Sequence, residues 1–170
     1  MRKLLNLGLF AAIFLFAEPV IAQDNKGLAK KSISPSNPLV GTWRLVVYAD
    51  FDSTTKAWLY PYGKNPRGYI TYTKNFLLNV NVSAETPLGI SQDSAKRSPM
   101  HFYGYLRSFA FGYFGTYAVD YEKMTLTHHP LGGSYPWSIG KDNTRPFAIK
   151  GDSLFIGDLN THPRIAIRAD

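Results

Sequence analysis

Short runs in which apolar and polar residues alternate make up most of the chain after residue 39. In the clearest run, Phe76–Val82, Leu78 and Val80 share one face while Asn79 and Asn81 lie on the other. This two-residue period is that of a strand with one buried face. Turn residues separate the runs, and nothing resembles a strand–helix–strand repeat, so the pattern predicts an all-β domain of about eight strands. The predicted strands are Val40–Ala49, Trp58–Tyr60, Gly68–Lys74, Phe76–Val82, Phe111–Asp120, Met124–His129, Arg145–Lys150, Ser153–Ile156 and Arg164–Arg168.

Two segments depart from this pattern. Pro99 precedes Met100–Phe109, in which Phe102 and Tyr105 lie at helical spacing with further apolar residues. Proline is tolerated in a first helical turn, so we predict one short helix there, with its aromatic stripe packed on the sheet. Pro130–Thr144 is rich in Gly, Pro and Ser and predicts a long connection.

Residues 1–22 have the layout of a cleaved secretory signal. Arg2 and Lys3 precede the apolar run Leu4–Ala17, and Ala22 ends a small-residue cleavage site. The run is shorter than the roughly 20 residues that span a bilayer, so we expect no stable membrane anchor. The sequence therefore predicts export to the periplasm or the outside of the cell.

The rest of the chain divides into a leader and one domain. Residues 23–38 are polar and contain Pro35 and Pro38, which predicts a flexible leader. Residues 39–170 have the length of a single domain. Because the chain has no cysteine, no disulfide can stabilise it, and the core must come from its Tyr, Phe and Trp residues.

The formal net charge of +7 raises the question of nucleic acid. After residue 22, however, the basic residues are scattered, and only Lys30-Lys31 and Lys96-Arg97 are adjacent. There is no basic stripe with interleaved aromatic residues, which argues against a nucleic-acid partner.

The adjacent pair His128 and His129 is the main candidate for chemistry. Neighbouring strand residues point to opposite faces, so the two imidazoles are not expected to bind one metal. His128 shares its face with Met124 and Leu126, which predicts that it points inward and His129 outward. Three interpretations stay open: a core histidine satisfied by a hydroxyl or backbone group, a ligand contact, or a general acid–base acting with Tyr117.

Other catalytic and metal chemistry lacks support. His101 and His162 are isolated, and no metal-binding histidine spacing occurs. There is also no cysteine, no nucleophile-elbow motif and no phosphate-binding loop, so we predict no metal and no cofactor.

Several segments, taken in order, resemble the bacterial lipocalin-like domain family over residues 39 to about 170. They are Leu39–Val46 with Gly41-Thr42-Trp43, Pro61–Thr73, Phe114–Asp120, Thr127–Pro130, Tyr135–Trp137 and Arg145–Phe147. The resemblance implies an up-and-down antiparallel barrel with a pocket, in which Trp43 plugs the closed end. It also implies that an arginine of the last strand stacks on Trp43, and either Arg164 or Arg168 fits. The closing segment His162–Asp170 is short, so whether the last strand closes the barrel stays open.

We expect the barrel to bind a small, largely apolar molecule. The alternatives are a barrel enzyme of the cyclase, isomerase or hydratase type, and a filled barrel that serves as an interaction module. Inward tyrosines suit a pocket and ordinary barrel filling equally well. The predicted ligand-lining residues lie on the apolar faces of their strands: Trp43, Leu45, Val47, Tyr72, Leu78, Val80, Tyr113, Tyr117, Leu126, His128, Phe147 and Leu154.

Overall fold

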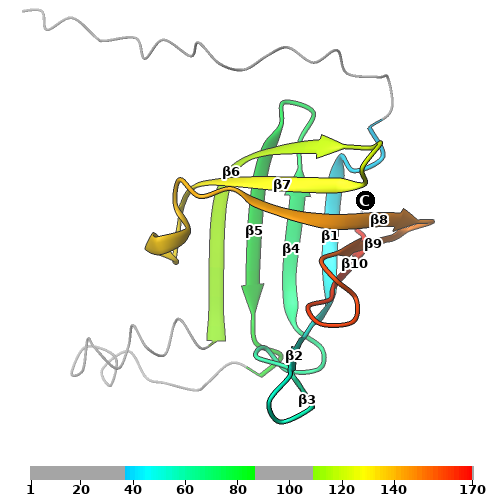
Figure 1. Cartoon of the computed structure of the whole chain (residues 1–170). Helices are drawn as coiled ribbons and strands as arrows, with labels where there is room; N and C mark the ends of the chain where they lie inside the picture. The colour runs from blue at the N-terminus through cyan, green and yellow to red at the C-terminus, as the bar shows by residue number, and fades with distance from the viewer. Residues whose placement is uncertain (1–36, 87–108, 170) are drawn as a thin grey trace, which may run out of the picture. The chain divides into compact units, whose positions relative to one another are not determined.

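Eight of the described strands form one closed antiparallel barrel (Figure 1). The structure, a computed structural model, describes residues 37–86 and 109–169. Consecutive barrel strands pair with each other and the first pairs with the last, in the order β1-β10-β9-β8-β7-β6-β5-β4, which is the up-and-down topology that was predicted. The strands are β1 (Gly41–Tyr48), β2 (Asp50–Asp52), β3 (Ala57–Leu59), β4 (Arg67–Tyr72), β5 (Leu77–Ser83), β6 (Ala110–Asp120), β7 (Thr125–Gly133), β8 (Asn143–Lys150), β9 (Ser153–Ile156) and β10 (Arg164–Arg168).

The last strand closes the barrel. β10 pairs with β9 on one side and with β1 on the other, where Trp43 faces Arg168. β1 in turn pairs with β4 through Trp43 and Ile70. Every barrel strand therefore has two neighbours, and closure removes the exposed sheet edges that favour aggregation.

The predicted strand faces agree with the structure over most of the barrel. In β5 buried and exposed residues alternate, with Leu78 and Val80 inside. On β4, Tyr72 is buried as predicted, and Ile70 on the same face is also buried. On β7, His128 is buried together with Leu126, as the two-residue period of the strand predicted.

The prediction that Val47 faces the barrel interior is wrong, because β1 contains a bulge. The register against β10 shifts between Leu45 and Val47, so one extra residue stands on the β1 side. Such a residue reverses the alternation that follows it. Tyr48 therefore packs against the core in place of Val47, which is only half-buried.

Both predicted ends of β7 also differ. Met124 lies in the β6–β7 turn with φ of 50° and is 40% exposed, so it does not share the buried face of His128. β7 continues to Gly133, beyond the predicted end at His129, because a second register shift beside Gly115 lets Pro130 stay in the sheet.

The helix predicted at Met100–Phe109 lies, except for its last residue, outside the described residues. Among the described residues the helical element is a single 3-10 turn, η1 (Pro136–Ser138), in the segment predicted as a connection. No helix in this part of the chain is long and apolar enough to cross a membrane.

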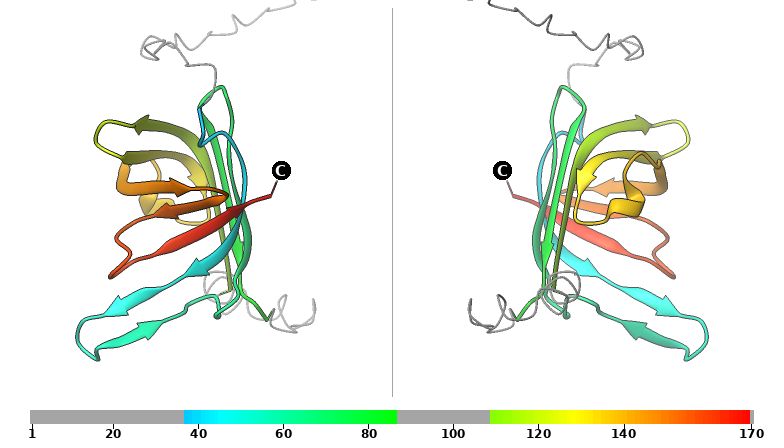
Figure 2. Two further views of the ribbon diagram at one scale, coloured as in Figure 1. Left: turned by 90° about the vertical axis from the view of Figure 1, so that its right-hand side faces the viewer. Right: turned by 90° about the vertical axis from the view of Figure 1, so that its left-hand side faces the viewer.

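A small two-stranded sheet follows β1. β2 and β3 pair with each other and not with the barrel. They extend from the end of β1 as an arm (Figure 2), on which Phe51 and Trp58 make an edge-to-face contact at 5.4 Å. The arm supplies Asp50, which is used at the cavity described below.

Candidate functional site

One end of the barrel is plugged by Trp43. The side chain is fully buried, and its indole Nε1 donates to the carbonyl of Leu39 at 2.8 Å. The Arg168 guanidinium carbon lies 4.1 Å from the centroid of the Trp43 ring, a cation–π distance. Arg168 also donates to the carbonyl oxygens of Pro38 and Val40. The arginine expected on Trp43 is therefore Arg168.

Side chains fill the part of the interior next to this plug. Tyr72 and Tyr117 pack edge to face at 4.9 Å, and the Tyr117 hydroxyl donates to the carbonyl of Thr73 at 2.8 Å. The other buried residues of this filled half include Leu78, Leu126, Phe147 and Leu154.

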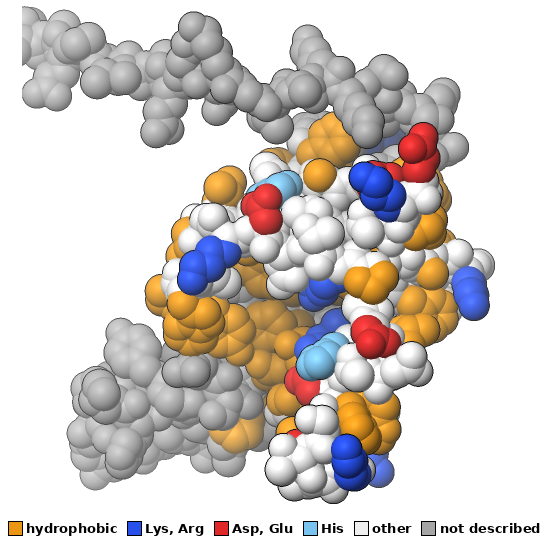
Figure 3. All heavy atoms as spheres, in the orientation of Figure 1, with side chains coloured by type: hydrophobic (Ala, Val, Ile, Leu, Met, Phe, Trp, Pro, Cys, Tyr) orange, Lys and Arg blue, Asp and Glu red, His pale blue; other side chains and the backbone are white. Residues whose placement is uncertain are grey.

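Beyond the filled half the barrel interior forms a cavity of about 410 Å³ that is open to solvent. Figure 3 shows it as a hollow floored by hydrophobic side chains, with basic side chains at one edge. The volume lies within the range of small-molecule sites, roughly 300–1,000 Å³. The apolar and aromatic lining residues are Leu45, Tyr48, Ile70, Val80, Val82, Phe111, Tyr113, Pro130, Tyr135, Trp137 and Ile156.

Aromatic rings in contact form one wall of the cavity. Phe111 meets Tyr48 edge to face at 5.7 Å and stacks on Tyr135 at 5.4 Å. Tyr135 in turn lies 5.1 Å from Trp137, which is 52% exposed. Packed rings present a flat apolar surface, and each ring restrains its neighbours, so the wall is preformed.

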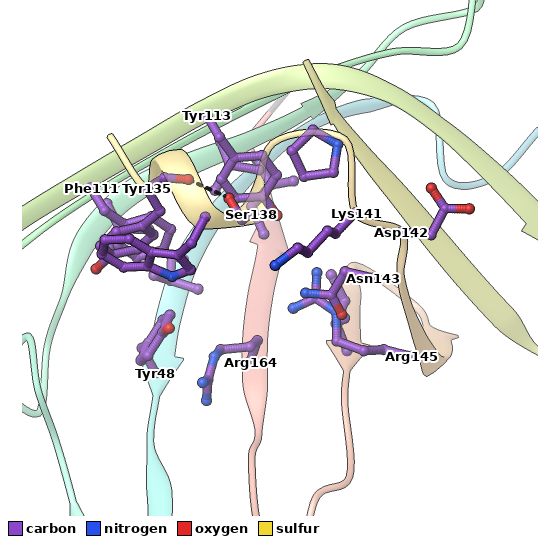
Figure 4. A pocket seen from close by; sticks show the side chains of 17 residues that line it. Tyr48, Phe111, Tyr113, Tyr135, Ser138, Lys141, Asp142, Asn143, Arg145 and Arg164 are labelled. Carbon is purple, nitrogen blue, oxygen red and sulfur yellow. Dashed lines mark hydrogen bonds between the residues drawn. The ribbon is translucent and has the colours of Figure 1, made fainter. Parts of the chain in front are cut away.

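Polar side chains form the other wall: Ser138, Lys141, Asp142, Asn143, Arg145 and Arg164. In Figure 4 Lys141, Asn143 and Arg145 lie opposite Phe111 and Tyr135. Arg164 is paired with Asp50 at 2.7 Å and lies 3.5 Å over the Tyr48 ring. The Asp142 carboxylate binds His129 Nδ1 at 2.6 Å, and Figure 4 shows it turned away from the cavity.

His128 lies between the filled half and the cavity. Its Nε2 is 2.8 Å from the Tyr72 hydroxyl, and its Nδ1 is 2.6 Å from the Tyr113 hydroxyl and 2.9 Å from Arg145 Nη2. A guanidinium only donates, so Nδ1 must accept and the ring proton belongs on Nε2, where it is donated to Tyr72. The inward histidine is therefore satisfied by tyrosine hydroxyls, the first of its three interpretations.

The imidazole is held neutral. Burial, and after it the charges of Arg145 and His129, keep the pKa of His128 well below its ordinary value. Burial raises the pKa of Tyr72 and also that of Tyr113, although Arg145 offsets part of the effect at Tyr113. At neutral pH the cluster therefore carries one positive charge, on Arg145.

The predicted catalytic partner Tyr117 does not reach His128. The two residues are directly opposed across β6 and β7, but the Tyr117 ring turns toward Thr73 and Phe76. The hydroxyl that links His128 to the cavity is that of Tyr113. Tyr117 therefore has a packing role in the filled half.

Eleven of the twelve predicted lining residues face the interior, and Val47 is the exception. The cavity itself is bordered by three of them, Leu45, Val80 and Tyr113. The others, Trp43, Tyr72, Leu78, Tyr117, Leu126, His128, Phe147 and Leu154, belong to the filled half or its boundary. Whether any of them contacts a ligand stays a prediction.

Sequence reasoning missed three important lining residues. Arg145 could have been found, because it shares the inward parity of Phe147 on β8. Tyr48 could not, since its inward position depends on the bulge. Tyr135 lies between β7 and η1, where no strand period applies.

The described residues contain no group of His, Asp or Glu side chains that could hold a metal ion. His129 and His162 are held by Asp142 and Thr161, on separate parts of the surface.

A closed up-and-down barrel, plugged at one end and hollow at the other, defines a calycin-type β-barrel. The chain belongs to the lipocalin-like domain family, whose family model matches residues 40–168. The match confirms the resemblance seen in the sequence. Searches of the curated proteins and of the solved structures each found no match.

Proposed function

We propose that the protein binds a small, largely apolar molecule inside the barrel. The observation that carries this proposal is the cavity of about 410 Å³ with its wall of aromatic rings. Core space in proteins is normally filled at high density, because unfilled apolar space loses dispersion contacts. This cavity is open to solvent on one side, so an apolar ligand that displaces its water would bury the apolar lining, which favours binding.

The enzyme alternative has weaker support. Its best feature is Tyr113, which borders the cavity and hydrogen-bonds His128 at 2.6 Å. His128 itself is 2% exposed and does not border the cavity. A general base has to lie within hydrogen-bond reach of the proton it removes, so the geometry favours binding over catalysis.

The experiment is a fluorescence titration with N-phenyl-1-naphthylamine, a neutral dye that brightens in apolar sites. We expect saturable binding to the wild-type protein. Val82→Phe, which places a ring in the cavity, should weaken binding about tenfold or more, by analogy with overpacking. Val47→Phe makes the same change at a position that does not border the cavity and is the matched control.

Two outcomes contradict the proposal. The first is no saturable binding by the folded wild-type protein. The second is equal affinity of the dye for Val82→Phe and wild type, because the dye would then lie outside the barrel.

We also propose that the protein acts in the periplasm or outside the cell. The support is the charged start, the apolar run Leu4–Ala17 and the cleavage pattern that ends at Ala22. Mass spectrometry of the exported protein should find a chain that starts at Gln23. A full-length chain recovered from the membrane fraction would contradict this proposal.

A further inference from the structure

Arg145 is a cation on the cavity wall, and no carboxylate of the described residues pairs with it. The described ion pairs are Lys123–Asp120, His129–Asp142 and Arg164–Asp50, and none includes Arg145. Its Nη2 contacts His128, but its Nε is buried and has no acceptor within hydrogen-bond reach. Both observations concern the same guanidinium, which lines the cavity.

Leaving this guanidinium unpaired costs free energy. A buried donor without an acceptor loses the hydrogen bonds that water would have provided. The guanidinium as a whole is only partly buried, and no carboxylate of the described residues neutralises the positive charge that it presents to the cavity. The neighbour His128 supplies no compensation, because it is neutral and contributes a single lone pair shared with Tyr113.

The other charges around the cavity do not change this picture. Asp142 is turned outward and bound to His129, and Asp50 is bound to Arg164. Lys141 also lines the polar wall and adds a second positive charge. The polar wall therefore presents a net positive field to a ligand, which favours anions.

We propose that the ligand is an organic acid, with an apolar or aromatic body and one anionic group that pairs with Arg145. This inference rests on the proposed binding function and specifies the ligand class for that same cavity. The body would lie against the Phe111–Tyr135–Trp137 wall, and the carboxylate against the opposite wall (Figure 4). A guanidinium offers two parallel donors, a geometry that suits a carboxylate.

The test compares two dyes that share one ring system. N-phenyl-1-naphthylamine is neutral, and 8-anilinonaphthalene-1-sulfonate adds a sulfonate to the same rings. Arg145→Met should weaken binding of the sulfonate dye about tenfold, the size of one charge-assisted hydrogen bond. The same variant should change the affinity for the neutral dye by no more than about twofold, since Met keeps the apolar bulk.

Arg67→Met is the matched control. It removes the same charge from an exposed position on β4 that borders a separate hollow with Arg44 and Tyr69. We expect it to leave both affinities unchanged. Arg145→Lys keeps the charge without the planar fork, so it should fall between wild type and Arg145→Met, and it provides a test if Arg145→Met does not fold.

A second experiment uses aliphatic ligands. Decanoate should displace the neutral dye from the wild-type protein better than decan-1-ol does, and Arg145→Met should remove that preference. This experiment extends the test from a sulfonate to a carboxylate.

The outcomes separate the two proposals. If the neutral dye binds but Arg145→Met weakens neither dye, or both equally, the organic-acid inference is wrong and the binding function stands. If Arg67→Met weakens the sulfonate dye instead, the anion binds on the outer wall and the inference is again wrong. If the wild-type protein binds neither dye, the binding function itself fails.

Discussion

Arg168 lies over the ring of Trp43, with its guanidinium carbon 4.1 Å from the ring centroid. The contact joins the last strand to the first, at the register position where the two residues face each other. Arg168 also donates to the carbonyls of Pro38 and Val40, while Trp43 donates to Leu39. One arginine thus ties together both ends of the barrel sheet and the segment that leads into it.

Trp43→Ala should lower the free energy of unfolding by about 3–5 kcal/mol, as large-to-small core substitutions do. Trp58→Ala should cost only about 1 kcal/mol, because Trp58 is 41% exposed on the β2–β3 arm. Chemical denaturation followed by circular dichroism measures both. Equal losses at the two sites would mean that Trp43 is not the plug of the barrel.

The face of each strand was predictable because burial on one side imposes a period of two. His128 inside and His129 outside follow from that rule alone, since Leu126 shares the face of His128. The rule fails where a residue is inserted. At Val47 and Tyr48 the strand keeps its apolar pattern through the bulge, so nothing in the local sequence marks the reversal.

The division of the interior into a filled half and a hollow half was not predictable. Tyr72 and Tyr113 are both inward tyrosines, yet one is packed against Tyr117 and the other borders the cavity. The difference depends on how deep in the closed barrel each residue lies. The two-residue period of a strand predicts which face a side chain is on, but not this depth. The apolar faces therefore identified the interior but not the cavity.

Gly115→Ala should destabilise the protein by about 1–3 kcal/mol, the usual range for overpacking. Gly115 is buried at the register shift between β6 and β7, and a Cβ there would lie 2.1 Å from the carbonyl oxygen of His129. A backbone carbonyl can move only if β7 moves. The thermal or denaturant midpoint of unfolding measures the loss.

Gly140→Ala is the control for Gly115→Ala. It has a left-handed φ of +74°, but nothing lies within 4 Å of a Cβ added there. Conformational strain alone should cost about 1 kcal/mol. A larger loss at Gly140 than at Gly115 would contradict the close approach of the two strands.

Stability should fall as the pH is lowered below about 6.5, the ordinary pKa of histidine, because of His128. Burial and Arg145 hold the folded pKa of His128 below the unfolded value. Above the unfolded pKa both states are neutral and the shift contributes nothing. Below the unfolded pKa the unfolded chain binds a proton that the folded protein excludes. The free energy of unfolding therefore falls by up to about 1.4 kcal/mol for each pH unit.

Urea unfolding between pH 7.5 and 5.5 measures this dependence. His128→Gln should reduce the slope of stability against pH, whatever its effect on stability at pH 7.5. His162→Gln, which removes an exposed imidazole, is the matched control. A slope that is equal in wild type and His128→Gln would show that His128 is not the residue responsible.

Trp137 should report occupancy of the cavity through its fluorescence. It lines the cavity and is 52% exposed, whereas Trp43 is fully buried and Trp58 is on the β2–β3 arm. A ligand against the aromatic wall displaces water from the Trp137 indole, so its emission should move to shorter wavelength. Decanoate, which does not absorb in this range, is a suitable probe under the organic-acid inference.

The decisive comparison is between two tryptophan variants at a decanoate concentration that saturates the wild-type protein by calorimetry. Trp58→Phe should keep the emission shift, and Trp137→Phe should lose it while still binding decanoate, because the rings of Phe111 and Tyr135 remain. If the shift persists in Trp137→Phe and disappears in Trp58→Phe, the ligand binds at the β2–β3 arm. The aromatic wall would then not be the binding surface, however well its size and chemistry suit an organic acid.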